Sequence, residues 1–437
     1  MPSDNILHIA INAQRPPNSG NGGVESVLIG LVSALGKLDD GKEEYIIIGP
    51  WENTDWLKPY MGPNQRLVQG PKPESEERPF ESIPFWSRPL ARRVHKLVYN
   101  FVNPDSTGSQ VPLSNGYYES LGCDVIHFPD QRFTLCALPS IYNPHDLQHL
   151  HYPQFFTPST LRWRESFSQA GCHFARVVVA GSQWVKNDLI EQYGLAPNKI
   201  QVIPWGAPTQ AISEPTPELL KDVKSKYNLP SAFAFYPAML WEHKNHLRLL
   251  DALAALRDQK GLTVRLVCTG NLQSAFWLKI KQHIEKLNLN SQVQFLGMVS
   301  YQELRAIYKL SQFVIVPTLF EAASGPVFEA WYEGISVACS TVTSLPEQAR
   351  DAALLFDPFS VQAIADAVQR LTTDERLRLD LVEKGQRRLM DFDWERTAKA
   401  YRAVYRRAAG RPLSEEDCQL LCWDWMQNPK LIIKETF

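Results

Sequence analysis

The chain has 437 residues, which is too long for one ordinary hydrophobic core and favours two or three domains. With 44% hydrophobic and 21% charged residues its composition is that of a globular protein, which excludes a disordered or fibrous chain. A formal net charge of -2 argues against a nucleic-acid partner.

The N-terminus and the cysteines indicate the compartment. Residues 1–14 carry no basic segment, and their apolar run is far shorter than the roughly 20 residues of a membrane span. We therefore expect a chain that is neither exported nor membrane-spanning. The seven cysteines are odd in number, scattered and without a Cys-x-x-Cys pair, which favours neither a disulfide framework nor a zinc site. The predicted location is cytoplasmic.

Short apolar runs rich in Ile, Val and Phe recur along the chain and are typical of strands buried on both faces of a parallel sheet. They are residues 6–11, 45–48, 124–128, 176–180, 201–204, 233–236, 264–268, 293–296, 313–316, 335–339 and 353–356. Between them lie helical apolar stripes, namely Val24, Leu28, Leu31, Leu35 and Leu38; Leu247, Leu250, Leu253 and Leu256; and Ile280, Ile284 and Leu287. This alternation predicts an α/β fold with doubly wound sheets.

The periodicity stops at residues 206–220, where Pro208, Pro215 and Pro217 cluster. We interpret this segment as a linker between two similar α/β halves. A ligand is then expected at the carboxyl ends of the strands, in the cleft between the halves.

Residues 70–117 are rich in proline and look like an insertion in the first half. Residues 79–102 contain four basic side chains, Arg88, Arg92, Arg93 and Lys96, together with the apolar Phe85, Trp86 and Leu90. A solvated helix that covers the sheet edge is the favoured interpretation. The alternative is a basic surface that meets anionic headgroups or a phosphorylated acceptor, and so touches the membrane peripherally at its inner face.

Two glutamates eight positions apart, Glu321 and Glu329, flank a turn of small residues. Pro326 is placed to be the first residue of a helix that Ser324 or Gly325 caps. Free backbone N–H groups at such a helix end form an anion site, and carboxylates suit the vicinal hydroxyl groups of a ribose or hexose. Together these features indicate a nucleotide-sugar pocket.

The glycine loop after the first predicted strand holds Gly20, Gly22 and Gly23. It does not match the dinucleotide-binding pattern G-x-G-x-x-G, because Glu25 stands where the third glycine is needed.

The frame around the two glutamates resembles the signature of retaining glycosyltransferases of family 4, which have the GT-B fold. Further matches run along nearly the whole chain: GGVES (22–26), DVIHFP (124–129), NPHDLQHLHYPQFF (143–156), VVVAGSQWVKNDLIEQYG (177–194), VIPWG (202–206), YPAMLWEHKNH (236–246), VQFLGMVS (293–300) and DWERTAKAYRAVY (393–405). Each is weak alone, but their combination is specific.

The resemblance assigns roles to three charged residues. Lys244 matches the family's lysine on the donor diphosphate, where a fixed cation stabilises the charge that grows as the nucleoside diphosphate leaves. Glu329 matches the glutamate that holds the ribose hydroxyls, and Glu321 matches the one near the transferred sugar.

The resemblance also implies backbone contacts with the donor. The backbone of Ala323, Ser324 and Gly325 would lie beneath the sugar and phosphate. The backbone around Gly297 and Met298 would hold the base.

In the first half, His145 matches a histidine placed against the sugar or acceptor, and Gly22 and Gly23 match a loop that approaches the donor phosphate and acceptor. The sequence departs from the family at Met239, which replaces an arginine beside the lysine, so one phosphate-binding cation is missing or supplied from elsewhere. Ala322 and Ser324 replace glycines of the usual Glu-Gly-Phe-Gly turn, which indicates a different sugar pocket.

The sequence predicts no metal site. Asp391 and Asp393 form the Asp-x-Asp pattern of the other glycosyltransferase fold, but they lie far from the predicted strand ends. Residues 145–151 contain three histidines and Asp146, but lack a ligand set with the usual zinc spacing.

As a whole, the resemblance implies a GT-B fold of two doubly wound Rossmann-like domains. Residues 1–206 would bind the acceptor and residues 207–395 the donor, with residues 396–437 packing back on the first domain.

The implied activity is a metal-independent retaining transfer of a hexose to a glycan or lipid-linked acceptor in bacterial polysaccharide assembly, without a cofactor. UDP-glucose is the favoured donor, and GDP-mannose is the next. The alternatives from other classes are a UDP-sugar 2-epimerase of related fold and a non-enzymatic sensor of sugar nucleotides.

Overall fold

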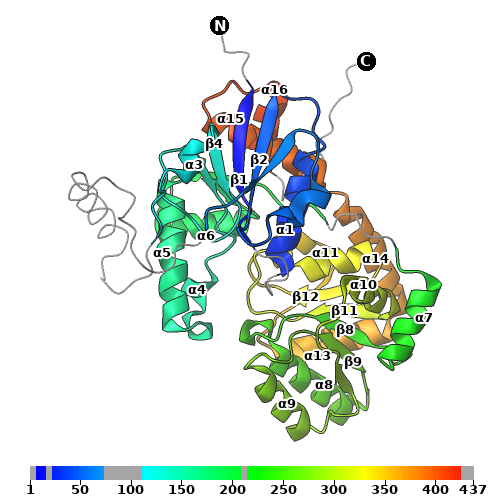
Figure 1. Cartoon of the computed structure of the whole chain (residues 1–437). Helices are drawn as coiled ribbons and strands as arrows, with labels where there is room; N and C mark the ends of the chain where they lie inside the picture. Colours follow the sequence, from blue (N-terminus) through cyan, green and yellow to red (C-terminus); the bar gives the residue numbers. More distant parts are fainter. Residues whose placement is uncertain (1–5, 16–21, 73–110, 208–213, 425–437) are drawn as a thin grey trace. The chain divides into compact units, whose positions relative to one another are not determined.

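The computed structural model describes residues 6–15, 22–72, 111–207 and 214–424. They form two compact units (Figure 1). One contains the described residues up to Trp205 together with those from Trp394 onward, and the other spans Gly206–Asp393. The interpretations of residues 79–102 and of Gly20 lie outside the described residues.

The first unit is built on a parallel sheet of seven described strands. In spatial order these are β3 (Gln65–Gln69), β2 (Glu43–Gly49), β1 (Leu7–Asn12), β4 (Val125–Phe128), β5 (Ser140–Tyr142), β6 (Val177–Ala180) and β7 (Ile200–Val202). The strand order reverses between the neighbours β1 and β4.

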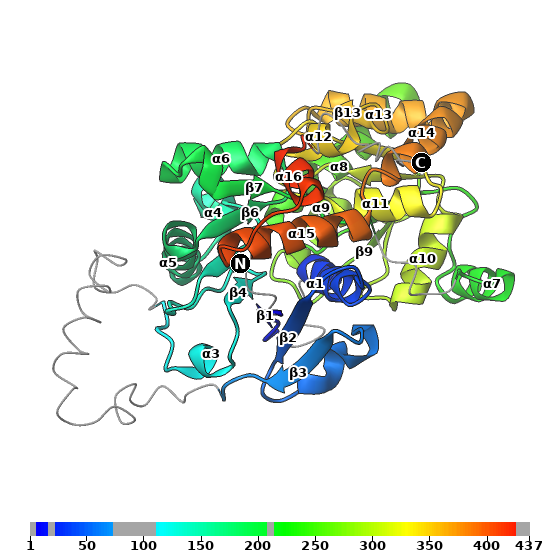
Figure 2. The same cartoon turned by 90° about the horizontal axis from the view of Figure 1, so that it is seen from above.

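Helices cover this sheet, and the last two come from the C-terminal part of the chain. They are α1 (Gly22–Leu35), η1 (Thr54–Tyr60), α3 (Tyr117–Ser120), α4 (Gln148–His151), η2 (Pro153–Phe155), α5 (Pro158–Phe174), α6 (Gln183–Tyr193), η3 (Pro197–Lys199), α15 (Trp394–Ala408) and α16 (Glu415–Cys422). Helix α15 lies between α1 and α16 and packs against both (Figure 2). It buries Tyr401 and Tyr405 in the core of this unit.

The second unit has the same strand order over six described parallel strands. They are β10 (Val293–Phe295), β9 (Leu266–Thr269), β8 (Ala234–Pro237), β11 (Phe313–Val316), β12 (Val337–Ser340) and β13 (Leu354–Phe356). Its helices are α7 (Pro217–Lys226), η4 (Glu242–Lys244), α8 (His246–Lys260), α9 (Trp277–Lys286), α10 (Tyr301–Leu310), α11 (Gly325–Tyr332), α12 (Leu345–Ala349), α13 (Val361–Thr373) and α14 (Glu375–Leu389).

The prediction of an α/β fold with two doubly wound Rossmann-like sheets is confirmed. All eleven predicted runs overlap strands, whereas β3 and β5 were not predicted.

Three local predictions were wrong. Helix α7 begins at Pro217, capped by the Thr216 hydroxyl, so the end of the expected linker is helical. Helix α1 ends at Leu35, and the chain turns at residues 36–37, which leaves Leu38 outside the helix. Leu287 lies just past α9.

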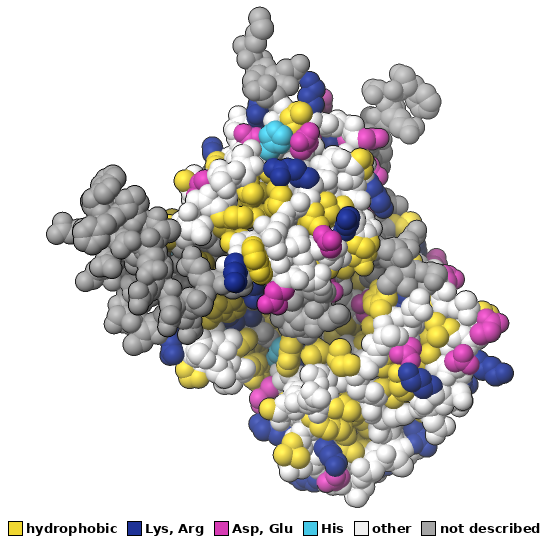
Figure 3. All heavy atoms as spheres, in the orientation of Figure 1, with side chains coloured by type: hydrophobic (Ala, Val, Ile, Leu, Met, Phe, Trp, Pro, Cys, Tyr) yellow, Lys and Arg dark blue, Asp and Glu magenta, His cyan; other side chains and the backbone are white. Residues whose placement is uncertain are grey.

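The described surface carries charges of both signs. On the face in Figure 3, basic and acidic side chains are interspersed without a large patch of one sign. Among the described residues no helix is both long enough and apolar enough to cross a membrane.

Candidate active site

The strand order of the second unit creates a switch point between β8 and β11. The connections from these two neighbouring strands leave the sheet in opposite directions, which opens a ligand position at their carboxyl ends. Lys244 ends the short helix η4 that follows β8, and Glu321 lies in the loop that follows β11. The two predicted charges therefore lie on either side of the switch point.

These two side chains form an ion pair. Lys244 Nζ lies 2.8 Å from Glu321 Oε2, and the two side chains are 16% and 11% exposed. Both loops are held in place: the amide nitrogen of Asn245 donates to the carbonyl oxygens of Pro317 and Pro358, each at 2.9 Å, and the backbone N–H of Glu321 donates to Thr343 Oγ1 at 3.1 Å. The pair is thus an ordered charge arrangement at the edge of the sheet.

Helix α11 begins directly after this loop, and its start differs from the prediction. Ser324 is the N-cap residue, but its hydroxyl is buried and makes no cap hydrogen bond; Pro326 is the second helical residue and not the first. The backbone N–H of Ser324 is also occupied, because it donates to Gln348 Oε1 at 2.8 Å. Gly325 and Val327, as early helical residues, have no intrahelical acceptor, so their N–H groups could donate to an anion.

Glu329 lies one turn further along α11 and is half-buried. The hydroxyl of Tyr308 on α10 donates to its Oε2 at 2.6 Å. Burial raises the pKa of Glu329, the Tyr308 hydrogen bond opposes that shift, and the nearby Glu333 adds to it. Glu329 and Tyr308 line a small surface hollow together with Tyr301. A carboxylate oriented in this way can accept hydrogen bonds from hydroxyl groups.

The other predicted donor-binding residues follow β8 and β10 at the same edge. Met239 is half-buried in the turn between β8 and η4. Gly297 has a φ of +77°, which favours glycine, and its carbonyl oxygen accepts from the N–H of Gly270 at 3.0 Å. Met298 beside it is 66% exposed.

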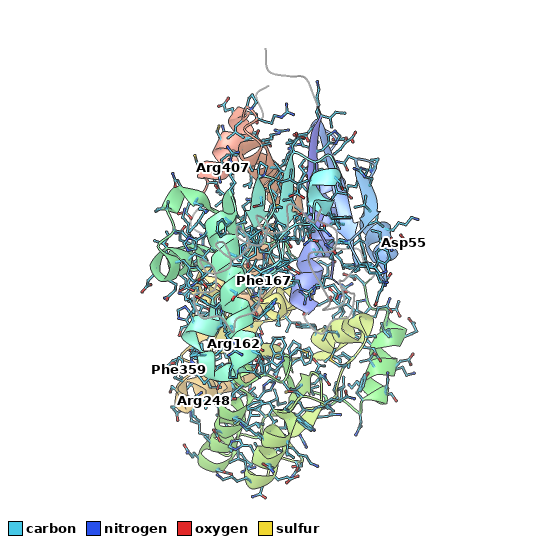
Figure 4. All side chains as sticks on the ribbon, turned by 60° about the vertical axis from the view of Figure 1, so that its left-hand side comes forward. Asp55, Arg162, Phe167, Arg248, Phe359 and Arg407 are labelled. Atoms are coloured by element: carbon cyan, nitrogen blue, oxygen red, sulfur yellow. The ribbon has the colours of Figure 1, made fainter. Side chains whose placement is uncertain are left out.

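Met239 is uncharged, so it supplies no second cation beside Lys244. Arg248 on α8 is an arginine close in sequence to Lys244, and Figure 4 shows it beside Phe359. Its Nη1 donates to Asn245 Oδ1 at 3.0 Å, and its Cζ lies 5.7 Å from the centre of the Phe359 ring. This guanidinium is therefore engaged within its own unit.

His145 belongs to the first unit, in the segment that follows β5. Its φ is +63°, an uncommon value for a residue with a side chain. Its Nε2 lies 2.9 Å from the carbonyl oxygen of Pro129, and its ring packs edge-on against Trp205 at 5.5 Å. Because a carbonyl can only accept, Nε2 carries the proton. Burial lowers the pKa of His145, so the ring is neutral and Nδ1 keeps its lone pair.

Gly22 and Gly23 begin α1, which follows β1, so they lie at the carboxyl edge of the first sheet at its own switch point. A Cβ on Gly23 would meet nothing within 4 Å. The structure thus groups Lys244, Glu321 and the start of α11 in one unit, and places His145 and the glycines in the other.

Sequence reasoning missed the residues that hold this site in place. Tyr308, Thr343 and Gln348 orient Glu329, Glu321 and Ser324. Of these three, only Tyr308 could have been found from the sequence, because it lies on the buried face of an amphipathic helix.

The histidines of residues 145–151 have separate partners. His149 Nε2 lies 2.8 Å from Glu165, and His151 Nε2 lies 2.8 Å from Asp188. Arg164 forms an ion pair with Asp146. Arg388 Nη1 donates a hydrogen bond to Asp391 Oδ2 at 3.0 Å. Within the described ranges no three His, Cys, Asp or Glu side chains form a group that could hold a metal ion.

Comparisons with known proteins place the chain in a family. Residues 21–211 match the model of Glycosyltransferase Family 4, and residues 220–388 match that of Glycosyl transferases group 1. The O-antigen chain mannosyltransferase B of Escherichia coli is 25% identical over 268 residues, which are 60% of this chain and 69% of that protein. The match to the serotype-specific mannosyltransferase WbdA of Escherichia coli covers 29% of its length.

Solved structures show the same architecture. The sucrose-phosphate synthase of Thermosynechococcus elongatus superposes with a TM-score of 0.64 at 19% identity, over 92% of this chain and 98% of that one. Anabaena Alr3699/HepE in complex with UDP and glucose superposes with a TM-score of 0.61 at 18% identity, over 91% and 99%. The chain is therefore a GT-B glycosyltransferase that belongs to family 4 in its first half and to glycosyl transferases group 1 in its second.

Proposed function

We propose that the protein transfers a hexose, with retention of configuration, from a nucleoside-diphosphate sugar to a glycan or lipid-linked saccharide in polysaccharide assembly. The observation that carries this proposal is the arrangement at the switch point of the second unit. There an ammonium group, two carboxylates and a helix start lie at one sheet edge.

Each group has a matching part of the donor. Lys244 binds the diphosphate through its positive charge. The N–H groups of Gly325 and Val327 donate hydrogen bonds to it. Glu329 accepts hydrogen bonds from the ribose hydroxyls, and Glu321 faces the sugar. The ion pair between Lys244 and Glu321 keeps both side chains ordered before the donor arrives.

The reaction needs no nucleophile from the protein. The acceptor hydroxyl attacks the anomeric carbon from the face that the diphosphate leaves. The bond to the phosphate oxygen breaks as the new glycosidic bond forms, and the departing oxygen takes the hydroxyl proton. Lys244 and the backbone N–H groups stabilise the growing charge on the diphosphate, so we propose a metal-independent and cofactor-free reaction.

His145 has a role on the acceptor side in this proposal. Its neutral ring presents the Nδ1 lone pair, because Nε2 donates to Pro129. A sugar hydroxyl can donate to that nitrogen. Accordingly we propose that the first unit binds the acceptor and the second unit the donor.

UDP-glucose is the proposed donor, supported by the fold shared with a protein solved with UDP and glucose. The second candidate is GDP-mannose, which is favoured by the sequence similarity to an O-antigen mannosyltransferase.

A thermal-shift screen tests donor binding. UDP-glucose, GDP-mannose and ADP-glucose are added to the full chain, and a ligand that binds the native state raises the midpoint by mass action. We expect UDP-glucose to raise it by several degrees, and Lys244→Ala to abolish the rise. Lys279→Ala, which removes an exposed lysine of the same unit, is the matched control. A rise that survives in Lys244→Ala would place the donor elsewhere.

Two assays separate the alternatives. Incubation with the UDP-sugar alone, followed by NMR, reveals a C2-inverted product only for an epimerase. Hexose transfer in the presence of EDTA should continue at the same rate, and its loss would contradict the metal-independent reaction.

A further inference from the structure

A network of buried hydrogen bonds crosses the core of the first unit next to His145. His127 on β4 is fully buried; its Nδ1 lies 2.9 Å from the hydroxyl of Tyr405, and its Nε2 lies 2.9 Å from Asn143 Oδ1. Asn143 Nδ2 in turn donates to the hydroxyl of Tyr401 at 2.6 Å. We call these four residues, Tyr405, His127, Asn143 and Tyr401, the His127 network.

The donors and acceptors of the network have one consistent assignment. Asn143 Oδ1 can only accept, so His127 Nε2 carries a proton. Burial lowers the pKa of His127 to about 4, so the ring is neutral at pH 7 and Nδ1 accepts from Tyr405. Both ring nitrogens are then satisfied in a single tautomer, and reversing any one bond would leave a buried group without a partner.

The network connects to His145 through two short stretches of backbone. Asn143 precedes His145 by two residues, and its own N–H donates to the carbonyl oxygen of Phe128 at 3.0 Å. The carbonyl oxygen that holds the His145 ring belongs to Pro129, two residues after His127. The backbone that carries His145 and the acceptor that orients its ring are therefore each anchored by a member of the network.

The backbone of His145 itself needs such an anchor. A φ of +63° is unfavourable for a residue with a Cβ, and such conformations persist only where the surrounding structure holds them. Pro144 has a fixed φ, which stiffens the backbone between Asn143 and His145. A displacement of Asn143 should therefore also displace the backbone of His145.

We propose that the His127 network positions His145, so that two tyrosines of the C-terminal helix α15 set the place and tautomer of a histidine more than 250 positions earlier in the sequence. The four residues are positioning residues and do not touch the substrate. The consequence for hexose transfer rests on the proposed function, whereas the consequence for the His145 ring does not.

Hydroxyl deletions test this proposal with a matched control. Tyr405→Phe and Tyr401→Phe each remove one hydroxyl from an end of the network. Tyr45→Phe removes a hydroxyl that is also buried, on a ring whose centre lies 6.2 Å from that of Tyr405, but which has no hydrogen-bond partner among the described residues. All three changes remove one oxygen atom from the same aromatic cluster.

The first measurement is NMR of the full chain labelled with ¹⁵N-histidine, in which the signals of His145 are assigned with His145→Gln. The wild type should show the Nε2-protonated ring. Tyr405→Phe and Tyr401→Phe should shift the His145 nitrogen signals, and Tyr45→Phe should leave them unchanged. Unshifted His145 signals in both network variants would overturn the proposal, whatever the activity.

The second measurement is the kinetics of hexose transfer. Displacement of a positioned group is expected to lower kcat about tenfold while the donor KM stays within about twofold. A fall in activity that Tyr45→Phe shares would assign these residues a structural role only. If the wild type transfers no hexose, the proposed function fails and the NMR result alone decides the proposal. Should one network variant not fold, the variant at the other end supplies both measurements.

Discussion

Lys244 Nζ lies 2.8 Å from Glu321 Oε2 at the point where the strand order of the second sheet reverses. The lysine follows β8 and the glutamate follows β11, so the pair joins two loops that are more than 70 residues apart in sequence. A donor diphosphate that binds at this edge meets a cation whose position is already set, which lowers the ordering cost of binding.

Glu321→Gln should lower kcat strongly. The amide keeps the shape of the carboxylate but not its charge, so an interaction that strengthens in the transition state is lost, at a cost of about a hundredfold. The donor KM should change little, because the glutamine oxygen can still accept a hydrogen bond from Lys244 and keep it in place. Steady-state kinetics of hexose transfer measure both quantities. Glu242→Gln, which neutralises an exposed glutamate beside Lys244, is the control. An unchanged kcat with a raised KM would assign Glu321 to donor binding alone.

Donor affinity should depend on the ionisation of Glu329. Burial raises its pKa, so this carboxylate becomes protonated at a higher pH than an ordinary glutamate does. The protonated acid is a poorer acceptor for ribose hydroxyls, and donor affinity should therefore fall as the pH drops through this raised pKa. Calorimetric titration with UDP-glucose over a pH series measures the fall.

Two variants identify the titrating group. Tyr308→Phe removes the hydrogen bond that opposes the shift, so the loss of affinity should begin at a still higher pH. Glu329→Gln should remove this dependence from the titration. The same pH profile in Glu329→Gln would mean that another group titrates.

Two glycines of helix α1 should differ in how much stability they lose on substitution by alanine. A Cβ on Gly30 would lie 2.1 Å from the Trp394 ring of α15, so Gly30→Ala should destabilise the first unit by about 1–3 kcal/mol despite the better helix propensity of alanine. Gly23→Ala meets nothing within 4 Å and should change stability by less than about 0.5 kcal/mol. Urea unfolding followed by circular dichroism compares them, and equal midpoints would contradict the close packing of α1 on α15.

His246→Leu should stabilise the protein at acid pH. His246 is buried, neither ring nitrogen has a hydrogen-bond partner among the described residues, and burial lowers its pKa to about 3. The unfolded chain binds a proton near the ordinary value of 6.5 while the folded chain does not, so stability is lost as the pH falls from about 6.5 to about 3. Leucine removes this loss, which amounts to about 2 kcal/mol at pH 5.

Urea unfolding at pH 7.5 and pH 5 measures that difference. The gain from His246→Leu should be larger at pH 5 than at pH 7.5. His173→Gln replaces an exposed histidine and serves as the control. A gain that does not grow towards acid pH would contradict the buried, neutral state of His246.

The sequence revealed most of the strands because a strand buried on both faces is a continuous apolar run. The two missed strands lack this signal. β3 (QRLVQ) is at the edge of its sheet and is polar at both ends, and β5 has three residues that directly follow Pro139. Their pairing with neighbouring strands defines them, and such pairing depends on tertiary structure.

The candidate site, too, could be predicted from the sequence only in part. Lys244 and Glu321 could be identified one at a time from motifs, but their ion pair depends on which strands are neighbours at the switch point. Ser324 was expected to cap α11 with its hydroxyl; instead the side chain of Gln348 holds its backbone, a contact that depends on the tertiary structure. The roles of these residues in catalysis stay predictions.

The first unit is interrupted by about 190 residues of the second, and α15 belongs to the first. During synthesis at roughly 5–20 residues per second, the N-terminal part therefore waits about 10–40 seconds for the helix that completes it. Throughout that interval His127 and Asn143 lack their tyrosine partners, and the side chains that α15 covers in the finished protein stay open to solvent. A nascent chain stalled before Trp394 should be a client for chaperones and an early target for proteases.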